Sequence, residues 1–132
     1  QVAATEDPEK AAMENTDRLD IPEGVEVYEI DGPFFFGLAS RFEELEQVKK
    51  SGTKVRIIRM RRVPFIDSTG INNLRNLCER TRKRGVTVIL SGVTEKVQAS
   101  LEKFGVDKEI GAENIFPHII PALDKAKSLV SF

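Results

Sequence analysis

An Asp-Ser-Thr-Gly run at residues 67–70 lies between an apolar stretch and a helical pattern, and its side chains are the best placed for chemistry in this chain. A serine at such a junction can cap the helix, act as a nucleophile or accept a phosphate. A nucleophilic serine needs a general base within hydrogen-bond reach, and the only histidine, His118, lies far along the sequence. The run also lacks the glycine patterns of a nucleophile elbow and of a P-loop. Catalysis by Ser68 is therefore disfavoured.

The helix that follows explains the two remaining uses of the serine. Its first backbone N–H groups have no intrahelical partner, so an oxygen of Asp67 or Ser68 can accept from them. The same groups, with the positive end of the helix dipole, stabilise a phosphate. Phosphorylation would add about 1.5 to 2 negative charges beside Asp67 and repel a partner docked there. We therefore predict a docking or anion site at Asp67, Ser68, Thr69 and Gly70, with Ser68 as the candidate phosphoacceptor.

The other reactive side chains indicate structural roles. A single cysteine, Cys78, excludes an internal disulfide and a thiolate metal cluster, and its place on an apolar helix face favours the core. His118 follows Pro117 at a predicted helix start, where we expect a mostly neutral surface imidazole. The arginines in residues 59–62 (RMRR) could face a phosphate or an acidic partner, but we favour a solvated strand end. No metal, cofactor or catalytic residue is predicted.

Composition and charge exclude several classes of partner. The chain has 132 residues, of which 40% are hydrophobic, and its net charge of -1 comes from 20 basic and 21 acidic side chains. This balance gives no general attraction to nucleic acid or to an anionic membrane surface. No apolar run approaches the roughly 18 residues that a membrane span needs, so we expect no direct insertion into a bilayer. The sequence indicates one globular domain of ordinary composition.

The elements that position the serine follow from hydrophobic periodicity. Residues 1–23 are polar and acidic and are interpreted as a flexible linker. The alternation in residues 25–30 predicts a strand, and the turn at Asp31, Gly32 and Pro33 leads to a short second strand at 34–37. A helix is predicted over residues 38–50.

The second half of the chain repeats strand and helix. We predict strands at residues 54–60 and 86–90 and helices at 68–84, from the cap Thr94 to 104, and at 117–129, with a short final strand near 114–116. The pattern places Phe104 on the apolar face of the 94–104 helix, and both Ile119 and Ile120 on that of the 117–129 helix. The 68–84 helix leaves Asn72 and Arg75 free to face partners beside the serine, and the face it buries consists of Ile71, Leu74, Leu77, Cys78 and Thr81. The fold class is α/β, with a mixed, mostly parallel sheet of four to five strands and about four helices.

Several blocks of sequence resemble one family. The segment VPFIDSTGINNL (residues 63–74) resembles the signature turn of STAS domains, which bacterial anti-sigma-factor antagonists share with the tails of SulP-type anion permeases. The blocks EVYEIDGPFFFG, VTVILSGV, FGVDKEIGAENIFP and ALDKAK are similar to the permease branch. The resemblance covers about residues 24–130 and implies a STAS domain at 24–132. In the antagonists the serine after the aspartate is phosphorylated, and it corresponds to Ser68, where many permease tails carry a small residue.

The resemblance implies a regulatory, non-enzymatic domain on the cytosolic side of the cell membrane, in a protein that transports sulfate or a related anion. Residues 1–23 would then be the tether to its membrane domain, which fits a chain that begins at Gln1. The implied partners are the transmembrane domain of the same chain, a second copy, or a soluble regulator such as a carrier protein or a kinase. The proposed surface joins the Ser68 helix start to Asp31, Gly32 and Pro33.

The sequence leaves two alternative functions open. The chain could be a stand-alone anti-sigma-factor antagonist that phosphorylation of Ser68 releases from a kinase-type partner. It could also be a small-ligand module that binds a nucleotide or a phosphopantetheine-bearing carrier protein at the same helix start. The permease-like blocks count against the first, and the lack of a glycine-rich element counts against the second.

Overall fold

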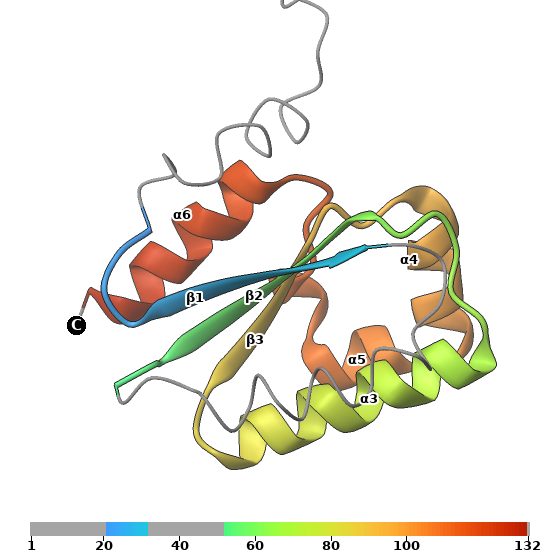
Figure 1. Ribbon diagram of the computed structural model, residues 1–132, viewed down its shortest axis with the longest axis horizontal. Helices are drawn as coiled ribbons and strands as arrows, with labels where there is room; N and C mark the ends of the chain where they lie inside the picture. The colour runs from blue at the N-terminus through green and yellow to red at the C-terminus, as the bar shows by residue number, and fades with distance from the viewer. Residues whose placement is uncertain (1–20, 32–51, 132) are drawn as a thin grey trace, which may run out of the picture.

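The computed structural model describes residues 21–31 and 52–131 of the chain. Within these residues three strands form one parallel sheet in the order β1-β2-β3 (Figure 1). The strands are β1 (Val25–Asp31), β2 (Val55–Arg62) and β3 (Thr87–Ser91). β2 is the central strand, and both of its faces are covered by helices. This explains why its sequence is apolar at successive positions.

Helices cover the sheet on both faces. Figure 1 shows α6 on one face and α3 with α5 on the other, while α4 follows the carboxyl end of β3. The bounds are α3 (Ser68–Lys83), α4 (Glu95–Lys103), α5 (Val106–Ile110), a short 3₁₀ helix η4 (Ala112–Asn114) and α6 (Ile119–Val130). No helix in the described ranges is long and apolar enough to cross a membrane.

The core is divided by the sheet into two apolar clusters. Successive side chains of a strand point to opposite faces, so Ile57 packs toward α6 while Ile58 packs toward α3. The α6 cluster includes Val25, Val55, Ile89, Ile119 and Leu123. The larger cluster gathers α3, α4 and α5 around Met60, Leu74, Leu77, Leu90 and Leu101.

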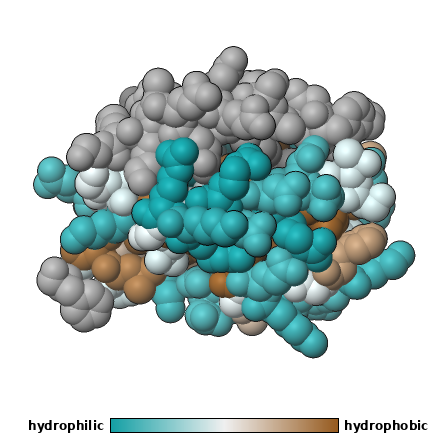
Figure 2. Space-filling view, turned by 90° about the horizontal axis from the view of Figure 1, so that it is seen from below, coloured by the Kyte–Doolittle hydropathy of each residue, from teal (hydrophilic) through white to brown (hydrophobic). Residues whose placement is uncertain are grey.

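The solvent side of the α3 layer is mostly hydrophilic in Figure 2, which views the molecule from below. This agrees with the amphipathic pattern of α3, whose buried face is the one predicted from the sequence. Its buried residues include Ile71, Leu74, Leu77, Cys78 and Thr81. The apolar side of α3 therefore packs against the core, and its polar side faces solvent.

Most predicted elements are confirmed within the described residues. The strands predicted at 25–30, 54–60 and 86–90 and the helices predicted at 68–84, 94–104 and 117–129 all form, with boundaries shifted by a few residues. The α/β fold class with a mostly parallel sheet is confirmed, and the described part of the sheet has three strands, all parallel. Pro121 lies in the first turn of α6, where a missing N–H costs nothing. The strand predicted at 34–37 and the helix predicted at 38–50 lie outside the described residues.

The segment between α4 and α6 contains more regular structure than the sequence indicated. Residues 105–116 hold α5 and η4, two short helices that each follow a glycine. The predicted final strand appears as a single parallel bridge between Ile115 and Leu90. The chain therefore returns along the free edge of β3 before α6 begins.

The interpretation of residues 59–62 as a solvated strand end is wrong for Arg59. Its exposed fraction is 0%, whereas that of the Arg62 side chain is 47%. Arg59 lies opposite Glu29 on one neighbouring strand and Ser91 on the other, inside the sheet. The sequence predicted the strand to end at residue 60, but β2 continues to Arg62, with a register shift against β1 after Arg59. Arg59 is buried because strands flank it on both sides.

Two apolar residues were assigned to helix faces that they do not share. Ile120 was predicted to face the core with Ile119 but is 46% exposed, since Ala122 and Leu123 complete the buried side of α6. Phe104 was placed on the buried face of α4, but the helix ends at Lys103 and the ring is exposed.

Candidate functional site

The start of α3 is capped by Asp67. Its backbone is extended, and its Oδ1 accepts a hydrogen bond of 2.8 Å from the backbone N–H of Gly70. The Asp67 carbonyl accepts the first helical bond from Ile71 N–H at 2.8 Å. Of the two caps that the sequence allowed, the aspartate therefore takes the role, and Ser68 is the first residue of the helix proper.

Ser68 and Thr69 stand exposed at this corner. Asp67 and Asn72 are exposed as well, while Gly70 is buried beneath them and anchors the turn. In the described part of the chain no hydrogen bond engages the Ser68 hydroxyl, and the first turn of α3 holds no acidic side chain. The hydroxyl group is therefore accessible at the positive end of a sixteen-residue helix.

The other predicted surface residues divide into three groups. Asp31 ends β1 and pairs in register with Arg62, whereas Gly32 and Pro33 lie outside the described residues. Asn72 is exposed one turn beyond Ser68. Arg75, by contrast, is held: its Nε donates to the Glu109 carboxylate at 3.0 to 3.1 Å, and its Nη2 donates to the Phe104 carbonyl. Arg75 therefore fastens α5 to α3.

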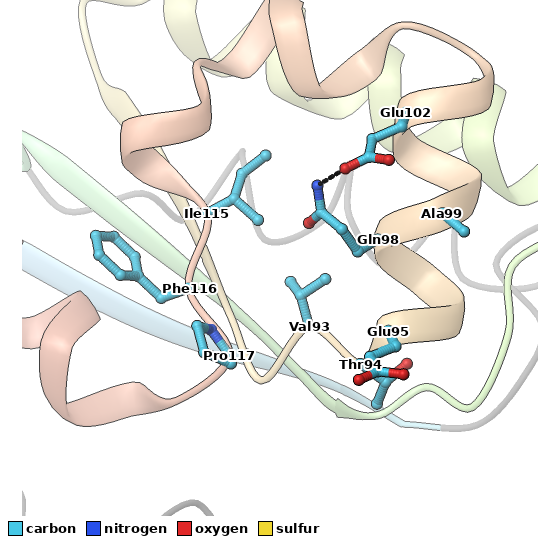
Figure 3. Close-up of a pocket in the computed structure, with 9 residues that line it drawn as sticks. All are labelled: Val93, Thr94, Glu95, Gln98, Ala99, Glu102, Ile115, Phe116 and Pro117. Carbon is cyan, nitrogen blue, oxygen red and sulfur yellow. Dashed lines mark hydrogen bonds between the residues drawn. The ribbon is translucent and has the colours of Figure 1, made fainter.

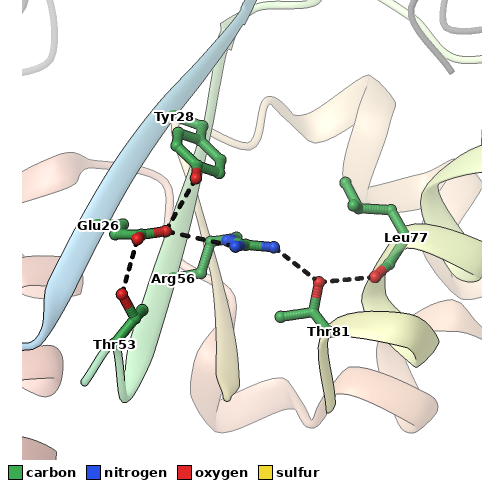
Figure 4. Close-up of polar contacts among 6 residues, drawn as sticks. All are labelled: Glu26, Tyr28, Thr53, Arg56, Leu77 and Thr81. Carbon is green, nitrogen blue, oxygen red and sulfur yellow. Dashed lines mark hydrogen bonds and ion pairs between the residues drawn. The ribbon is translucent and has the colours of Figure 1, made fainter. Parts of the chain in front are cut away.

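A polar cluster that sequence reasoning missed crosses from β1 to α3 (Figure 4). Arg56, which is 1% exposed, contacts the Glu26 carboxylate at 3.3 Å through Nη2 and donates to the Thr81 hydroxyl at 3.1 Å through Nη1. The Thr81 hydroxyl in turn donates to the Leu77 carbonyl at 2.8 Å. The buried charge of Arg56 in the central strand is therefore paired with the Glu26 carboxylate and hydrogen-bonded to a side chain of α3.

The same carboxylate gathers two more donors. The Tyr28 hydroxyl donates to Glu26 at 2.9 Å and the Thr53 hydroxyl donates at 2.7 Å, while the Arg56 guanidinium lies 4.9 Å from the centre of the Tyr28 ring. Burial, followed by the hydrogen bond to Glu26, raises the pKa of Tyr28 above its ordinary value. The register pair Glu26 and Arg56 was visible in the sequence only as two charges in different strands.

A hollow opens between α4 and the segment that returns along β3 (Figure 3). Its volume is about 320 Å³. Figure 3 shows Gln98 of α4 reaching toward Ile115, which follows η4, across this hollow. The lining residues are Val93, Thr94, Glu95, Gln98, Ala99, Glu102, Ile115, Phe116 and Pro117.

The remaining reactive groups are structural. Cys78 is buried in the α3 cluster as predicted, and burial raises the pKa of its thiol to about 12. His118 lies at the N-cap of α6 and is half-buried, and its side chain makes no capping hydrogen bond. Within the described residues no group of three or more His, Cys, Asp or Glu side chains could hold a metal ion.

Sequence comparison connects these features to a family. The STAS domain family profile matches residues 18–126. A proposed sulfate transporter, YvdB of Bacillus subtilis (strain 168), is 30% identical over 96 residues. That alignment includes 71% of this chain but only 18% of YvdB, so the chain spans less than a fifth of its curated relative.

Solved structures agree with the profile. A sulfate transporter family protein from Wolinella succinogenes is 45% identical, with a TM-score of 0.83 over 89% of this chain and 96% of that one. The STAS domain of a SulP transporter from Vibrio cholerae is 32% identical, with a TM-score of 0.78 over 92% and 96% of the two chains. An anti-sigma factor antagonist of Thermotoga maritima shares the fold, at 18% identity and a TM-score of 0.63 over 82% and 92%. The chain therefore belongs to the STAS domain family and is homologous to the STAS domain of a SulP transporter.

Proposed function

We propose that this chain is the regulatory and interaction domain of a SulP-type anion transporter and that the start of α3 is its docking corner. The identities of 45% and 32% to transporter-family domains support this assignment. The small share of YvdB that the chain spans fits one domain of a larger protein. The domain acts without catalysis from the cytosolic side of the cell membrane. Its partner is the transmembrane domain of its own chain, a second copy, or a soluble regulator such as a carrier protein or a kinase.

One observation carries the proposal: Asp67 caps α3, which leaves the Ser68 hydroxyl exposed and free of any structural duty in the described residues. A modification of that hydroxyl does not remove the cap, so the helix survives it. The docking corner consists of Asp67, Ser68, Thr69 and Asn72, all exposed on a turn that buried Gly70 holds in place. Its shape is therefore constant while its charge can change.

A phosphate on Ser68 switches the corner electrostatically. It brings about 1.5 to 2 negative charges, which the helix dipole stabilises within this molecule. The charge adds to that of Asp67 on the outer surface, so a partner that accepts the neutral serine meets two adjacent anions. Docking is lost, and transport by the parent protein changes with it.

A stand-alone antagonist of an anti-sigma factor is the second candidate, favoured by the exposed serine directly after an aspartate. The gene separates the two candidates. A series of apolar segments of about 20 residues encoded upstream of Gln1 supports the transporter. A start codon just before Gln1 supports the antagonist and overturns the first proposal.

The switch is tested by a pull-down of the membrane domain encoded with this chain, using wild-type, Ser68→Ala and Ser68→Asp proteins. We expect the alanine variant to bind as wild type and the aspartate variant to bind about tenfold more weakly. Ser128→Asp is the matched control, because Ser128 is an exposed serine on α6, on the opposite face of the sheet. Equal binding by both Ser68 variants rules out a charge switch at this position.

A further inference from the structure

We propose that the hollow beside α4 is a second docking site and that its occupant is a basic peptide segment, which inserts one apolar side chain between α4 and residues 115–117. The site lies on different elements from the Ser68 corner. The shape, the rigidity and the charge of the hollow support this assignment.

The floor of the hollow fits an apolar side chain. Val93, Ala99, Ile115, Phe116 and Pro117 supply most of its lining. A volume of about 320 Å³ exceeds what one aliphatic or aromatic side chain needs and lies at the small end of the range for ligand sites. Apolar area left open in this way is stabilised when a partner covers it.

Both walls of the hollow are fixed before any partner arrives. The Thr94 hydroxyl caps α4 by accepting from Val97 N–H at 3.3 Å. On the other wall, Phe116 N–H donates to the Leu90 carbonyl at 2.9 Å and Val93 N–H donates to the Phe116 carbonyl at 3.2 Å. A site that is formed in advance loses little conformational entropy when it binds.

The charge on the rim selects the occupant. Glu95 and Glu102 line the hollow from α4, and Gln98 Nε2 holds the Glu102 carboxylate with a hydrogen bond of 2.9 Å (Figure 3). The two lysines of α4, Lys96 and Lys103, are not among the lining residues, so the helix separates its charges. The mouth of the hollow is therefore negative, which favours lysine or arginine on the occupant.

This charge argues against other occupants. The acidic residues 1–23 of the chain would bring carboxylates to a rim that already carries two. A small molecule would need convergent polar groups in the floor to orient it, and the floor residues are apolar. If the chain is a transporter tail, as proposed above, the excess of lysine and arginine in cytoplasmic loops of membrane proteins supplies such segments next to it.

The binding step is tested on the 132-residue chain with synthetic heptapeptides. The probe is Lys-Lys-Leu-Phe-Lys-Lys-Ala, compared with a version that has glutamate for every lysine and a version that has Ser-Ser for Leu-Phe. We expect saturable shifts of the amide resonances of Gln98, Ala99 and Ile115 with the first peptide alone. Binding should weaken as salt is added, because the rim charges are exposed to solvent.

Substitutions in the lining residues test whether the peptide binds in the hollow. Glu95→Gln with Glu102→Gln keeps the shape of the rim and should weaken binding about fivefold, since each exposed pair contributes modestly. Ala99→Leu fills the hollow and should abolish the shifts. The matched controls are Glu79→Gln on α3 and Ala112→Leu on η4, both at exposed positions outside the lining. Both controls should bind as wild type.

Three results would overturn the inference: no shift at these amides with the basic peptide, equal binding of the glutamate peptide, or shifts that appear with protein concentration alone. The last result would assign the hollow to a second copy. Because the peptide assay needs no membrane domain and does not involve Ser68, its failure leaves the proposed function standing. A failed Ser68 pull-down likewise leaves this site untouched.

Discussion

Arg56 shows how one residue can decide the local architecture. A guanidinium on a central strand is costly to bury unless its charge and its donors are matched. Glu26 and Thr81 match it from β1 and α3, so the sheet edge, the sheet centre and the helix meet at one side chain. The cluster specifies how β1 pairs with β2, because a shift by one residue would separate the two charges.

Replacing Arg56 with methionine keeps most of the volume and removes the charge. We expect the free energy of unfolding to fall by about 3 kcal/mol, because the Glu26 carboxylate then loses its buried partner. Urea denaturation measures this loss. Arg62→Met is the matched control and should change stability by less than about 0.5 kcal/mol, since that side chain is exposed. A loss in the control as large as that of Arg56→Met would contradict the assigned role.

Cys78 makes stability depend on pH at the alkaline end. Its thiol has an ordinary pKa of 9.0, and burial raises this to about 12 in the folded protein. Between these values the unfolded chain releases a proton that the folded chain keeps. The contribution to stability is therefore complete below pH 9 and is lost as the pH rises toward 12.

The difference in unfolding free energy between wild type and Cys78→Ala should shrink above pH 9, by roughly 1.4 kcal/mol per pH unit. Denaturation of both proteins across this range measures the effect, and the subtraction cancels the titration of tyrosine and lysine. A difference that stays constant with pH would show that the thiol ionises in the folded state.

The turn between β3 and α4 packs closely against the central strand. Gly92, which follows β3, has a φ of +67°, and a Cβ built on it would lie 2.6 to 2.8 Å from the backbone of Arg61. Such a contact cannot be accommodated without moving β2 or the start of α4. The glycine therefore lets the β3–α4 turn lie against the carboxyl end of the central strand.

Gly92→Ala should lower the free energy of unfolding by about 3 kcal/mol, since backbone strain and overpacking add at this position. Gly85→Ala isolates the first cause, because Gly85 has a φ of +81° and nothing within 4 Å of the added Cβ. We expect it to cost about 1 kcal/mol. Thermal and urea denaturation of both variants provide the comparison, and equal losses would mean that the Arg61 contact is relieved at no cost.

At the scale of the whole molecule, the described residues form two apolar clusters with one sheet between them. Ile57 and Ile58 are neighbours in β2 and belong to opposite clusters. Because both clusters are attached to the same strand, loss of packing on one face should destabilise the other. The domain is therefore expected to unfold as one unit.

Ile57→Ala removes packing only from the α6 cluster and should lower stability by about 2 to 4 kcal/mol. The slowest-exchanging amides of α3, on the other face, should then exchange faster by the same factor as those of α6. Native-state hydrogen exchange measures both, and Ile58→Ala is the reciprocal variant. Acceleration confined to α6 would show that the two layers open independently.

Local patterns were enough to predict most of the described elements and part of the site. The stripe from Ile71 to Thr81 predicted α3 and its buried face, and the run at 67–70 predicted a capped helix start. The same local chemistry did not decide which oxygen caps the helix, because Asp67 and Ser68 are both competent. The structure shows that Asp67 is the cap. The docking role of the corner and the switch at Ser68 remain predictions.

The sequence by itself determined the periodicities, the helix starts and the turn residues, since these depend on neighbours a few positions apart. Only the tertiary structure decided that Arg59 is buried, that Arg56 meets Glu26 and Thr81, and that Arg75 fastens α5. It also created the hollow, whose walls are more than ten residues apart in the chain. Burial and pairing depend on which segments lie side by side, and that information is absent from any single window of sequence.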